Sequence, residues 1–223
     1  MNKTLALVPV KALNKAKSRL GPLLSADECA NLSLMMLEDV LMAISSAKKV
    51  DQIVILTNDF QVIEIANKRG YLVLNDETGE LSAELDKAAF KLKTFGANKI
   101  VVIPSDVPTI NGSDIDRLLT EHSAGLSVCS AYRDGGTNVL ICSPPDALRF
   151  QFGKNSAKRH VEEAAAADLP AKLIRRAAFG QDIDTPDDLL WLSKQKATIN
   201  SVEFLLNTGI AARVNQYTVG TSA

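Results

Sequence analysis

The sequence of 223 residues has only three cysteines, Cys29, Cys129 and Cys142, and no two of them form a CxxC pair. An odd number of widely spaced cysteines argues against a disulfide framework and against a zinc ribbon. No apolar run is expected to reach the roughly 18–20 residues of a membrane span. The apolar run near the N-terminus ends at Lys11, too early for a signal peptide. We therefore expect a cytoplasmic protein with three buried, reduced thiols.

An excess of charge of either sign is also missing, because 25 basic and 26 acidic side chains leave a net charge of −1. Neither a nucleic acid nor a membrane surface is therefore expected as a partner. Hydrophobic residues make up 46% and charged residues 23%, which excludes a disordered or fibrous chain. A chain of this length forms one domain, or one domain with a small appendage. The oligomeric state is left open, a homodimer included.

Short apolar runs alternate with longer amphipathic ones, which predicts an α/β fold: a mostly parallel twisted sheet with helices on both faces. The expected strands are 5–10, 52–57, 71–74, 99–104, 126–131, 138–142 and an edge strand at 172–178. The expected helices are 25–48, 62–69, 81–95, 113–121, 157–167 and 186–196. Residues 197–223 are polar and weakly patterned, so we divide the chain into a domain at 1–196 and a C-terminal extension at 197–223.

Four cations follow the first expected strand within nine residues: Lys11, Lys15, Lys17 and Arg19. In parallel α/β proteins, ligands bind at the carboxyl ends of the strands. Lysine point charges and an arginine fork at such a place suit a polyphosphate. The segment contains neither the GxxxxGK[ST] phosphate loop nor the GxGxxG dinucleotide motif. A basic loop that is merely solvated is the alternative.

Acidic residues form a second candidate site. Asp106 comes directly after the fourth expected strand, and Asp182 and Asp184 alternate before the last expected helix. Alternating residues of an extended segment point the same way, so the three carboxylates can form one cluster for Mg²⁺. The alternatives are that Asp106 caps the following helix and that the acidic segment is a helix start, which explains Asp187 and Asp188 well.

A glycine turn and a glycine loop form the weakest candidate. Thr137 follows the turn, and Gly153 and Ser156 open a basic helix, which is an arrangement that binds anions. A hairpin turn and a capped surface helix are the alternative. Of the two histidines, His122 is expected at the surface near a helix end, and His160 is expected to brace this loop.

Five segments in this order, VPVKxLxxAKSRL, PSDVP, GGTNVL, FGxxSxxRH and DIDTP, resemble the phospholactate/phosphoenolpyruvate guanylyltransferases of coenzyme F-420 biosynthesis, the CofC/FbiD family. The resemblance covers residues 5 to about 192. It implies the GT-A-like nucleotidyltransferase fold of the nucleotide-diphospho-sugar transferases. It also implies transfer of GMP from GTP to the phosphate of a small acid, with release of pyrophosphate. The acid would be 2-phospho-L-lactate, phosphoenolpyruvate or 3-phospho-D-glycerate.

The resemblance also implies roles for single residues. The residues that the resemblance implies for binding the GTP phosphates and for catalysis are Lys11, Lys17 and Arg19. Ser82 stands where the family usually has asparagine and is assigned to the nucleotide. Those implied for Mg²⁺ are Asp106, Asp182 and Asp184. Those implied for the acid are Thr137, Gly153 and Ser156.

Two other interpretations stay open. One is another enzyme of the same fold, either a molybdopterin or sugar-1-phosphate nucleotidyltransferase or a glycosyltransferase, although a sugar nucleotidyltransferase has a glycine-rich loop where this chain has lysines. The other is a non-catalytic nucleotide-binding module, against which the three carboxylates argue. A phosphate acceptor, with its second pKa near 6, is already largely ionised at pH 7 and needs no general base. The scarcity of histidine fits such an acceptor.

Overall fold

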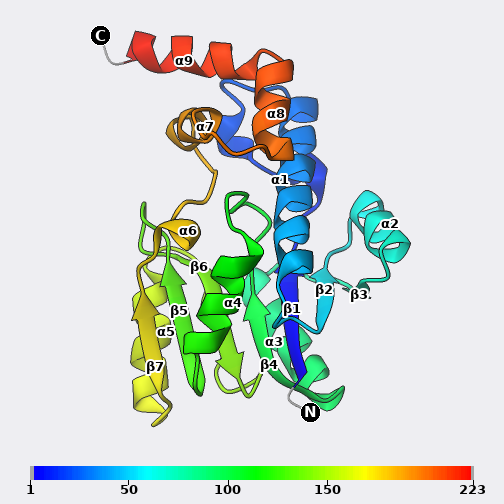
Figure 1. Ribbon diagram of the computed structural model, residues 1–223, viewed down its shortest axis with the longest axis vertical. Helices are drawn as coiled ribbons and strands as arrows, with labels where there is room; N and C mark the ends of the chain where they lie inside the picture. Colours follow the sequence, from blue (N-terminus) through cyan, green and yellow to red (C-terminus); the bar gives the residue numbers. More distant parts are fainter. Residues whose placement is uncertain (1–2, 222–223) are drawn as a thin grey trace.

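The computed structural model describes residues 3–221, and the side chains of residues 3–217. Its sheet has seven strands in the order β3-β2-β1-β4-β6-β5-β7 (Figure 1). The strands are β1 (Lys3–Pro9), β2 (Gln52–Leu56), β3 (Leu72–Leu74), β4 (Ala97–Val102), β5 (Gly125–Ser130), β6 (Thr137–Ser143) and β7 (Ala171–Ile174). Only β6 runs antiparallel to its neighbours, β4 and β5. The prediction of a mostly parallel sheet is confirmed.

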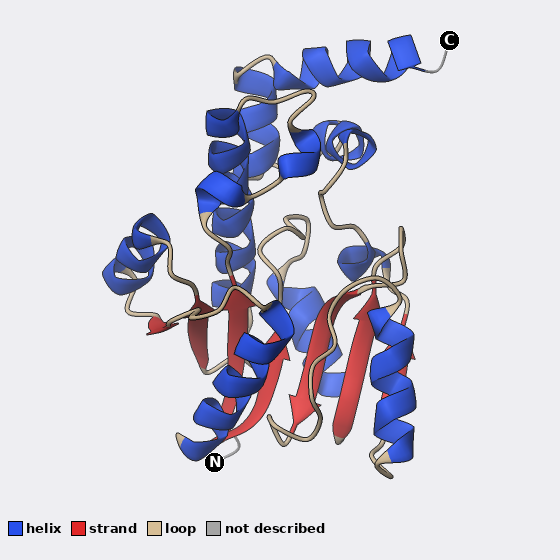
Figure 2. Cartoon of the chain, turned by 180° about the vertical axis from the view of Figure 1, so that it is seen from behind, coloured by secondary structure: helices blue, strands red, loops and turns tan. Residues whose placement is uncertain are grey.

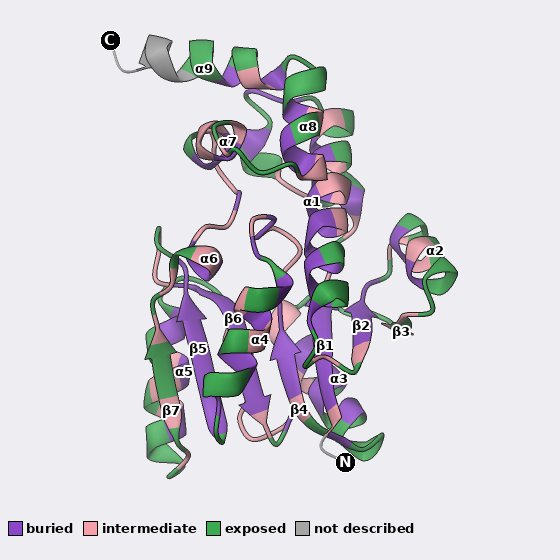
Figure 3. Cartoon of the chain, viewed as in Figure 1, coloured by how far each residue is buried: buried purple, intermediate pink, exposed green. Residues whose placement is uncertain are grey.

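Successive residues of the central strands enter two different cores, one on each face of the sheet. In β1, Ala6 and Val8 join one core, and Leu5 and Leu7 join the other. This alternation follows from the two-residue period of a strand. Because helices cover both faces, β1 is buried on both, and Figure 3 shows the central strands in the buried colour. Each fully buried leucine stabilises the fold by roughly 1.5–3 kcal/mol.

Helices lie on both faces of the sheet (Figure 2). Helices α1, α2 and α4 contribute to one core, and α3 and α5 contribute to the other. The helices are α1 (Ala26–Ser46), α2 (Phe60–Lys68), α3 (Leu81–Thr94), α4 (Gly112–Glu121), α5 (Ser156–Ala166), α6 (Ala177–Gly180), α7 (Pro186–Ser193), α8 (Asn200–Asn207) and α9 (Ile210–Thr221). Two short 3₁₀ helices, η1 (Leu13–Lys15) and η2 (Ser18–Leu20), follow β1.

Helix α1 connects two parts of the molecule. Its C-terminal half packs on the sheet through residues such as Leu41 and Ile44. Its N-terminal half belongs to a third core, in which Leu32 and Met36 meet α7, α8 and α9. Within the described chain, α1 alone has the length and composition of a membrane span, with 21 residues and a mean hydropathy of 1.3 in one window. The expectation that no stretch is so apolar is wrong, but 56% of that window is buried inside the fold, as in the core helix of a soluble protein.

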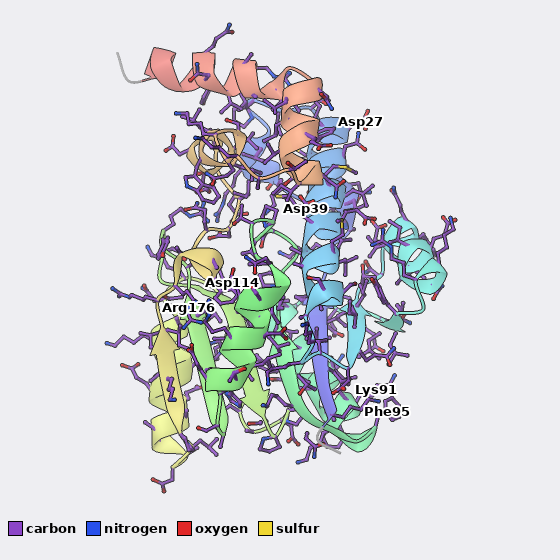
Figure 4. All side chains as sticks on the ribbon, viewed as in Figure 1. Asp27, Asp39, Lys91, Phe95, Asp114 and Arg176 are labelled. Carbon is purple, nitrogen blue, oxygen red and sulfur yellow. The ribbon has the colours of Figure 1, made fainter. Side chains whose placement is uncertain are left out.

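Within the predicted extension at 197–223, whose last two residues lie outside the described part, the chain forms two helices where the sequence shows only weak patterning. Val202 and Leu205 of α8 and Ile210 of α9 are buried in the third core. The start of α8 is fixed by Asp39 of α1, whose carboxylate accepts hydrogen bonds from Asn200 N at 2.7 Å and from Ser201 N at 2.9 Å (Figure 4). This cap comes from a residue 161 positions away, so the local sequence carries no sign of it.

Two further expectations need correction. Strand β7 ends at Ile174 and a helical turn, α6, begins at Ala177, so the expected strand at 172–178 is too long. His122 is buried and not at the surface, because Ser127 and Ser143 bind its ring nitrogens at 2.9 and 2.7 Å. Burial lowers the pKa of His122 to about 4 and so keeps the ring neutral.

Candidate active site

A cavity of about 400 Å³ lies at the carboxyl ends of the central strands. Pro9 and Val10 line it at the end of β1, Leu56 at the end of β2, and Pro104 and Ser105 after β4. Its charged lining residues are Lys11, Lys15, Lys17, Arg19, Asp76, Glu84, Asp106 and Asp184. The cavity is therefore where ligands of parallel α/β proteins are expected to bind. It is lined by all three basic residues that the family resemblance implies for the GTP phosphates.

Lys17 lies between two of the predicted metal ligands. Its Nζ is 2.7 Å from Asp106 Oδ2 and 2.8 Å from Asp184 Oδ1, and its side chain is only 8% exposed. Burial opposes the charge on this ammonium group, but the two carboxylates outweigh burial and raise the pKa of Lys17. The loop around Lys17 is anchored by the buried side chains of Leu13 and Leu20. Lys17 itself adopts a left-handed backbone conformation with φ of 56°, which costs a residue other than glycine roughly 1–2 kcal/mol.

The two acidic segments are held side by side by a backbone hydrogen bond. Ile183 N donates to Asp106 O at 3.0 Å, which brings the segment of Asp182 and Asp184 to the end of β4. The following helix α4 is capped by Asn111, which accepts a hydrogen bond from Asp114 N. Asp106 is therefore free of the capping role that was its alternative explanation.

Arg133 is a site residue that the sequence does not reveal. It lies in the loop between β5 and β6, and its guanidinium contacts three carboxylates: Asp182 at 3.0 Å, Asp184 at 3.0 Å and Asp188 at 2.8 Å. Asp188 also forms the capping box of α7 with Thr185, so Arg133 ties the acidic segment to the start of this helix. The only sequence signal is a basic residue close to the glycine turn.

The two predicted metal ligands in this segment differ in their protonation behaviour. Burial, and next the charge of Asp106, raise the pKa of Asp182. Burial also acts to raise the pKa of Asp184, but Lys17 and Arg133 outweigh it and lower that pKa. Asp182 thus lies where additional positive charge would be stabilising.

The carboxylates fit a divalent cation in chemistry and place, although they do not form a finished site. In residues 3–221, no three or more His, Cys, Asp or Glu side chains are arranged as a ready metal cluster. However, Asp106 and Asp184 already converge on one cation, the ammonium group of Lys17. Carboxylate oxygens are the protein ligands that Mg²⁺ prefers. The assignment of Asp106, Asp182 and Asp184 to Mg²⁺ stays a prediction.

The remaining predicted nucleotide residues differ in their exposure. Lys11 lines the cavity and is exposed. Arg19 is 70% exposed and reaches Asp184 Oδ2 at 3.5 Å, so it is available to an incoming anion. Ser82 lies in the first turn of α3, where its Oγ accepts a hydrogen bond from Phe152 N at 3.0 Å. Ser82 thus contacts the glycine loop predicted for the acid.

The residues predicted for the acid lie together at the same edge of the sheet. Because β6 is antiparallel to β4, Thr137 at its start lies near the end of β4. The glycine turn packs on the glycine loop, since Ala157 N donates to Gly135 O at 3.2 Å and a Cβ at Gly136 would lie 3.3 Å from Gly153 O. Gly153 is exposed and has a φ of 126°, which favours glycine.

The two hydroxyls predicted for the acid are turned toward each other. Thr137 Oγ1 lies 2.9 Å from Ser156 Oγ and 3.0 Å from His160 Nδ1, and Ser156 is fully buried. His160 Nε2 accepts a hydrogen bond from Gln151 N, and burial lowers the pKa of His160 to about 4. The neutral ring therefore carries its proton on Nδ1 and donates it to Thr137. His160 braces this loop, as expected.

Comparisons with known proteins give consistent matches. The family described as "Guanylyl transferase CofC like" matches residues 4–221. A phosphoenolpyruvate guanylyltransferase from Roseiflexus sp. (strain RS-1) is 36% identical over 192 residues, 85% of each protein. A 2-phospho-L-lactate guanylyltransferase from Methanothermobacter thermautotrophicus is 33% identical, over 84% of this chain and 82% of the relative. A Desulfovibrio desulfuricans G20 crystal structure, named as a nucleotide-diphospho-sugar transferase, superimposes with a TM-score of 0.80 at 20% identity, covering 97% of this chain and 99% of the other.

Proposed function

The chain belongs to the CofC-like guanylyl transferases and is thus a nucleotidyltransferase, and from this premise we propose that it transfers GMP from GTP to the phosphate of a small phosphorylated acid. Pyrophosphate is released, and the product is a step toward coenzyme F-420. The names of the relatives support phosphoenolpyruvate and 2-phospho-L-lactate as acids. 3-Phospho-D-glycerate is a third acid to be tested. The buried, unpaired thiols fit a cytoplasmic enzyme.

One observation carries the proposal: a cavity at the strand ends in which Lys17 bridges Asp106 and Asp184. Such a cavity combines cations for a triphosphate with carboxylates for a divalent cation. Lys11 and Arg19 add positive charge at its rim. A non-catalytic nucleotide-binding module needs only the cations, so the carboxylate pair favours an enzyme.

The chemistry requires positioning and charge neutralisation more than proton transfer. The acceptor phosphate is largely ionised at pH 7, so it attacks the α-phosphorus of GTP without a general base, and the bond to pyrophosphate breaks. The two reactants are polyanions that repel each other, and Lys11, Lys17 and Arg19 reduce this repulsion. Asp106, Asp182 and Asp184 would hold Mg²⁺, which when bound neutralises phosphate charge.

The acid is assigned to the edge of the sheet beyond β4. The exposed Gly153, where no atom lies within 4 Å of the position that a Cβ would take, lets an anion approach the backbone closely, and the exposed Lys154 favours an anion there. Thr137 and Ser156 stand behind this loop in a hydrogen-bonded pair. In the sheet order, the acid would lie next to the strand whose end carries Asp106, and the acceptor phosphate would face the nucleotide.

The test is a pyrophosphate-release assay with Mg²⁺, each of the four nucleoside triphosphates and each of the three acids. We expect release only with GTP plus an acid, together with a product whose mass is that of the acid plus a GMP residue. Release with another nucleotide, or with a sugar 1-phosphate or molybdopterin as the acceptor, would show another enzyme of the same fold. GTP binding without turnover in any mixture would favour the non-catalytic module.

A further inference from the structure

The ammonium group of Lys17 occupies the point on which Asp106 and Asp184 converge. Both contacts are short, at 2.7 and 2.8 Å, and the side chain is 8% exposed. One carboxylate comes from the end of β4 and the other from the segment before α7. Lys17 is therefore the group that joins the two acidic segments through their side chains.

The same two carboxylates are assigned to the divalent cation, and one point cannot hold an ammonium group and a metal ion at once. A metal ion that binds both carboxylates must therefore displace Lys17. The displaced ammonium group would be a buried charge without a partner, which is unfavourable. The phosphates of a nucleotide in the same cavity offer it a new partner.

The surrounding cations do not take over this role. Arg19 reaches only Asp184, at 3.5 Å, and is 70% exposed. Arg133 binds Asp184 together with Asp182 and Asp188, and within the described structure it forms no ion pair with Asp106. Arg133 can hold the acidic segment in place while Lys17 leaves. The exchange thus depends on Lys17.

We propose that Lys17 blocks the carboxylate pair while the cavity is empty and releases it when nucleotide phosphates take its ammonium group, so that the divalent cation and GTP bind with positive coupling. This inference rests on the proposed function, because it takes GTP and a divalent cation as the ligands. By linkage, the cation strengthens GTP binding by the same factor by which GTP strengthens cation binding. Metal alone binds weakly, and GTP alone must compete with two carboxylates for Lys17.

The experiment measures Mn²⁺ binding without nucleotide, by the electron paramagnetic resonance signal of the free ion. The proteins are the wild type, Lys17→Gln, Lys17→Arg and the control Lys15→Gln. The Lys15→Gln substitution removes the same charge from the same loop, but Lys15 is exposed. We expect Lys17→Gln to bind Mn²⁺ about ten-fold more tightly or better, within the usual 5–150-fold range of coupling. Lys17→Arg, which keeps the blocking charge, and Lys15→Gln should stay within about three-fold of the wild type.

A second variant shows where the ion binds and keeps the test independent of folding. Adding Asp106→Asn to Lys17→Gln should remove the gain in Mn²⁺ affinity, and circular dichroism checks the fold of each protein. Equal Mn²⁺ affinities of folded wild type and Lys17→Gln would overturn the coupling role. A gain of the same size in Lys15→Gln would also overturn it, because the effect would then be one of general charge.

A final arm separates this inference from the proposed function. Calorimetry measures GTP binding to the wild type with and without Mn²⁺. If GTP does not bind under either condition, the proposed function is wrong, whatever the Mn²⁺ results are. If GTP binds equally well with and without Mn²⁺, the enzyme can still be a guanylyltransferase but the coupling is absent. Tighter GTP binding with Mn²⁺, together with the gain in Lys17→Gln, supports the inference.

Discussion

The group around Lys17 and the group around His160 lie at the same edge of the sheet, but they differ in charge and in access to solvent. The first joins Lys17, Asp106 and Asp184 by ionic contacts in the wall of a cavity. The second joins neutral side chains, Thr137, Ser156 and His160, in the interior. In our proposal the first group exchanges its partners for ligands, whereas the hydrogen-bonded side chains of the second group hold a loop in shape.

The difference has a physical origin in what each group gains from a ligand. Buried neutral hydroxyls that already have hydrogen-bond partners gain little from a ligand, so they stay paired. Carboxylates that lie close to one another are stabilised by positive charge. In the absence of ligands Lys17 supplies this charge, and in our proposal a metal ion replaces it. We therefore expect substitutions in the first group to affect catalysis most and substitutions in the second to affect stability most.

The largest effect is expected from Asp106→Asn. Loss of one carboxylate charge from the assigned metal site should lower turnover by about 100-fold or more, since charge stabilisation by a metal contributes several kcal/mol. The fold should survive because the Asp106 side chain is partly exposed. Steady-state kinetics in saturating Mg²⁺ and a thermal melt test this. Asp187→Asn, at an exposed position in the first turn of α7, is the control, and a tenth or more of wild-type activity in Asp106→Asn would remove this residue from the metal site.

A smaller effect is expected from removing the cations of the first group. Lys17→Ala and Arg19→Ala should each weaken GTP binding in the presence of Mg²⁺ by about ten-fold to a hundred-fold, because a hydrogen bond to a charged group contributes about 1.5–3 kcal/mol. Binding of the acid should change less. Calorimetry with GTP and kinetics in the acid compare the two. Equal losses for GTP and acid would place this loop at the acceptor, and the two groups would no longer differ in their ligand.

A fall in pH should destabilise the protein through the second group, because that group contains the buried His160. The pKa of His160 is about 4 in the folded protein, because burial and the nearby Arg159 disfavour its charge, against an ordinary value near 6.5. The contribution of neutral His160 to the free energy of unfolding is fully present above pH 6.5. It is lost as the pH falls toward 4, because the histidine of the unfolded chain binds a proton that the buried histidine does not. Between pH 7 and pH 5 this histidine should account for a loss of about 2 kcal/mol in unfolding free energy.

Urea unfolding of the wild type and of His160→Gln at both pH values measures this loss. The carboxylates titrate in both proteins, so the difference between the two losses isolates His160. The wild type should lose about 2 kcal/mol more than the variant on going from pH 7 to pH 5. Equal losses would mean that His160 is not kept neutral by the fold.

The fold was predictable from the sequence where local signals agree with tertiary structure. The apolar runs around Leu5 and Ile100 and the capping box of Ser25 and Glu28 predict elements that the structure contains. The C-terminal helices were not predictable, because α8 is capped by Asp39 from α1. The prediction for His122 was wrong because its partners, Ser127 on β5 and Ser143 on β6, come next to it only when the sheet forms.

The candidate site was predictable for charged residues next to an expected strand end or helix start, and less so for residues that act through other residues. Lys17 and Asp106 follow expected strands and Asp184 precedes the last expected helix, and the three side chains meet in the structure. Arg133 has no such signal, because its importance comes from three carboxylates about fifty positions away. The contact of Lys17 with the two carboxylates likewise could not be predicted from the sequence, because only the fold brings these side chains together.

The smallest effect is expected from Ser156→Ala, and it decides whether the second group braces or binds. The Ser156 hydroxyl is fully buried and lies 2.9 Å from Thr137 Oγ1, so its loss should cost about 1 kcal/mol of stability, the usual contribution of a neutral hydrogen bond. The loop that opens α5 would loosen, and the KM of the acid should rise while the GTP dissociation constant stays within about two-fold. Thr94→Ala, which removes an exposed hydroxyl on α3, should change neither constant.

If Ser156→Ala keeps its stability but loses acid binding, the hydroxyl contacts the acid directly and the second group resembles the first. If it loses GTP affinity and keeps its acid KM, this loop belongs to the nucleotide.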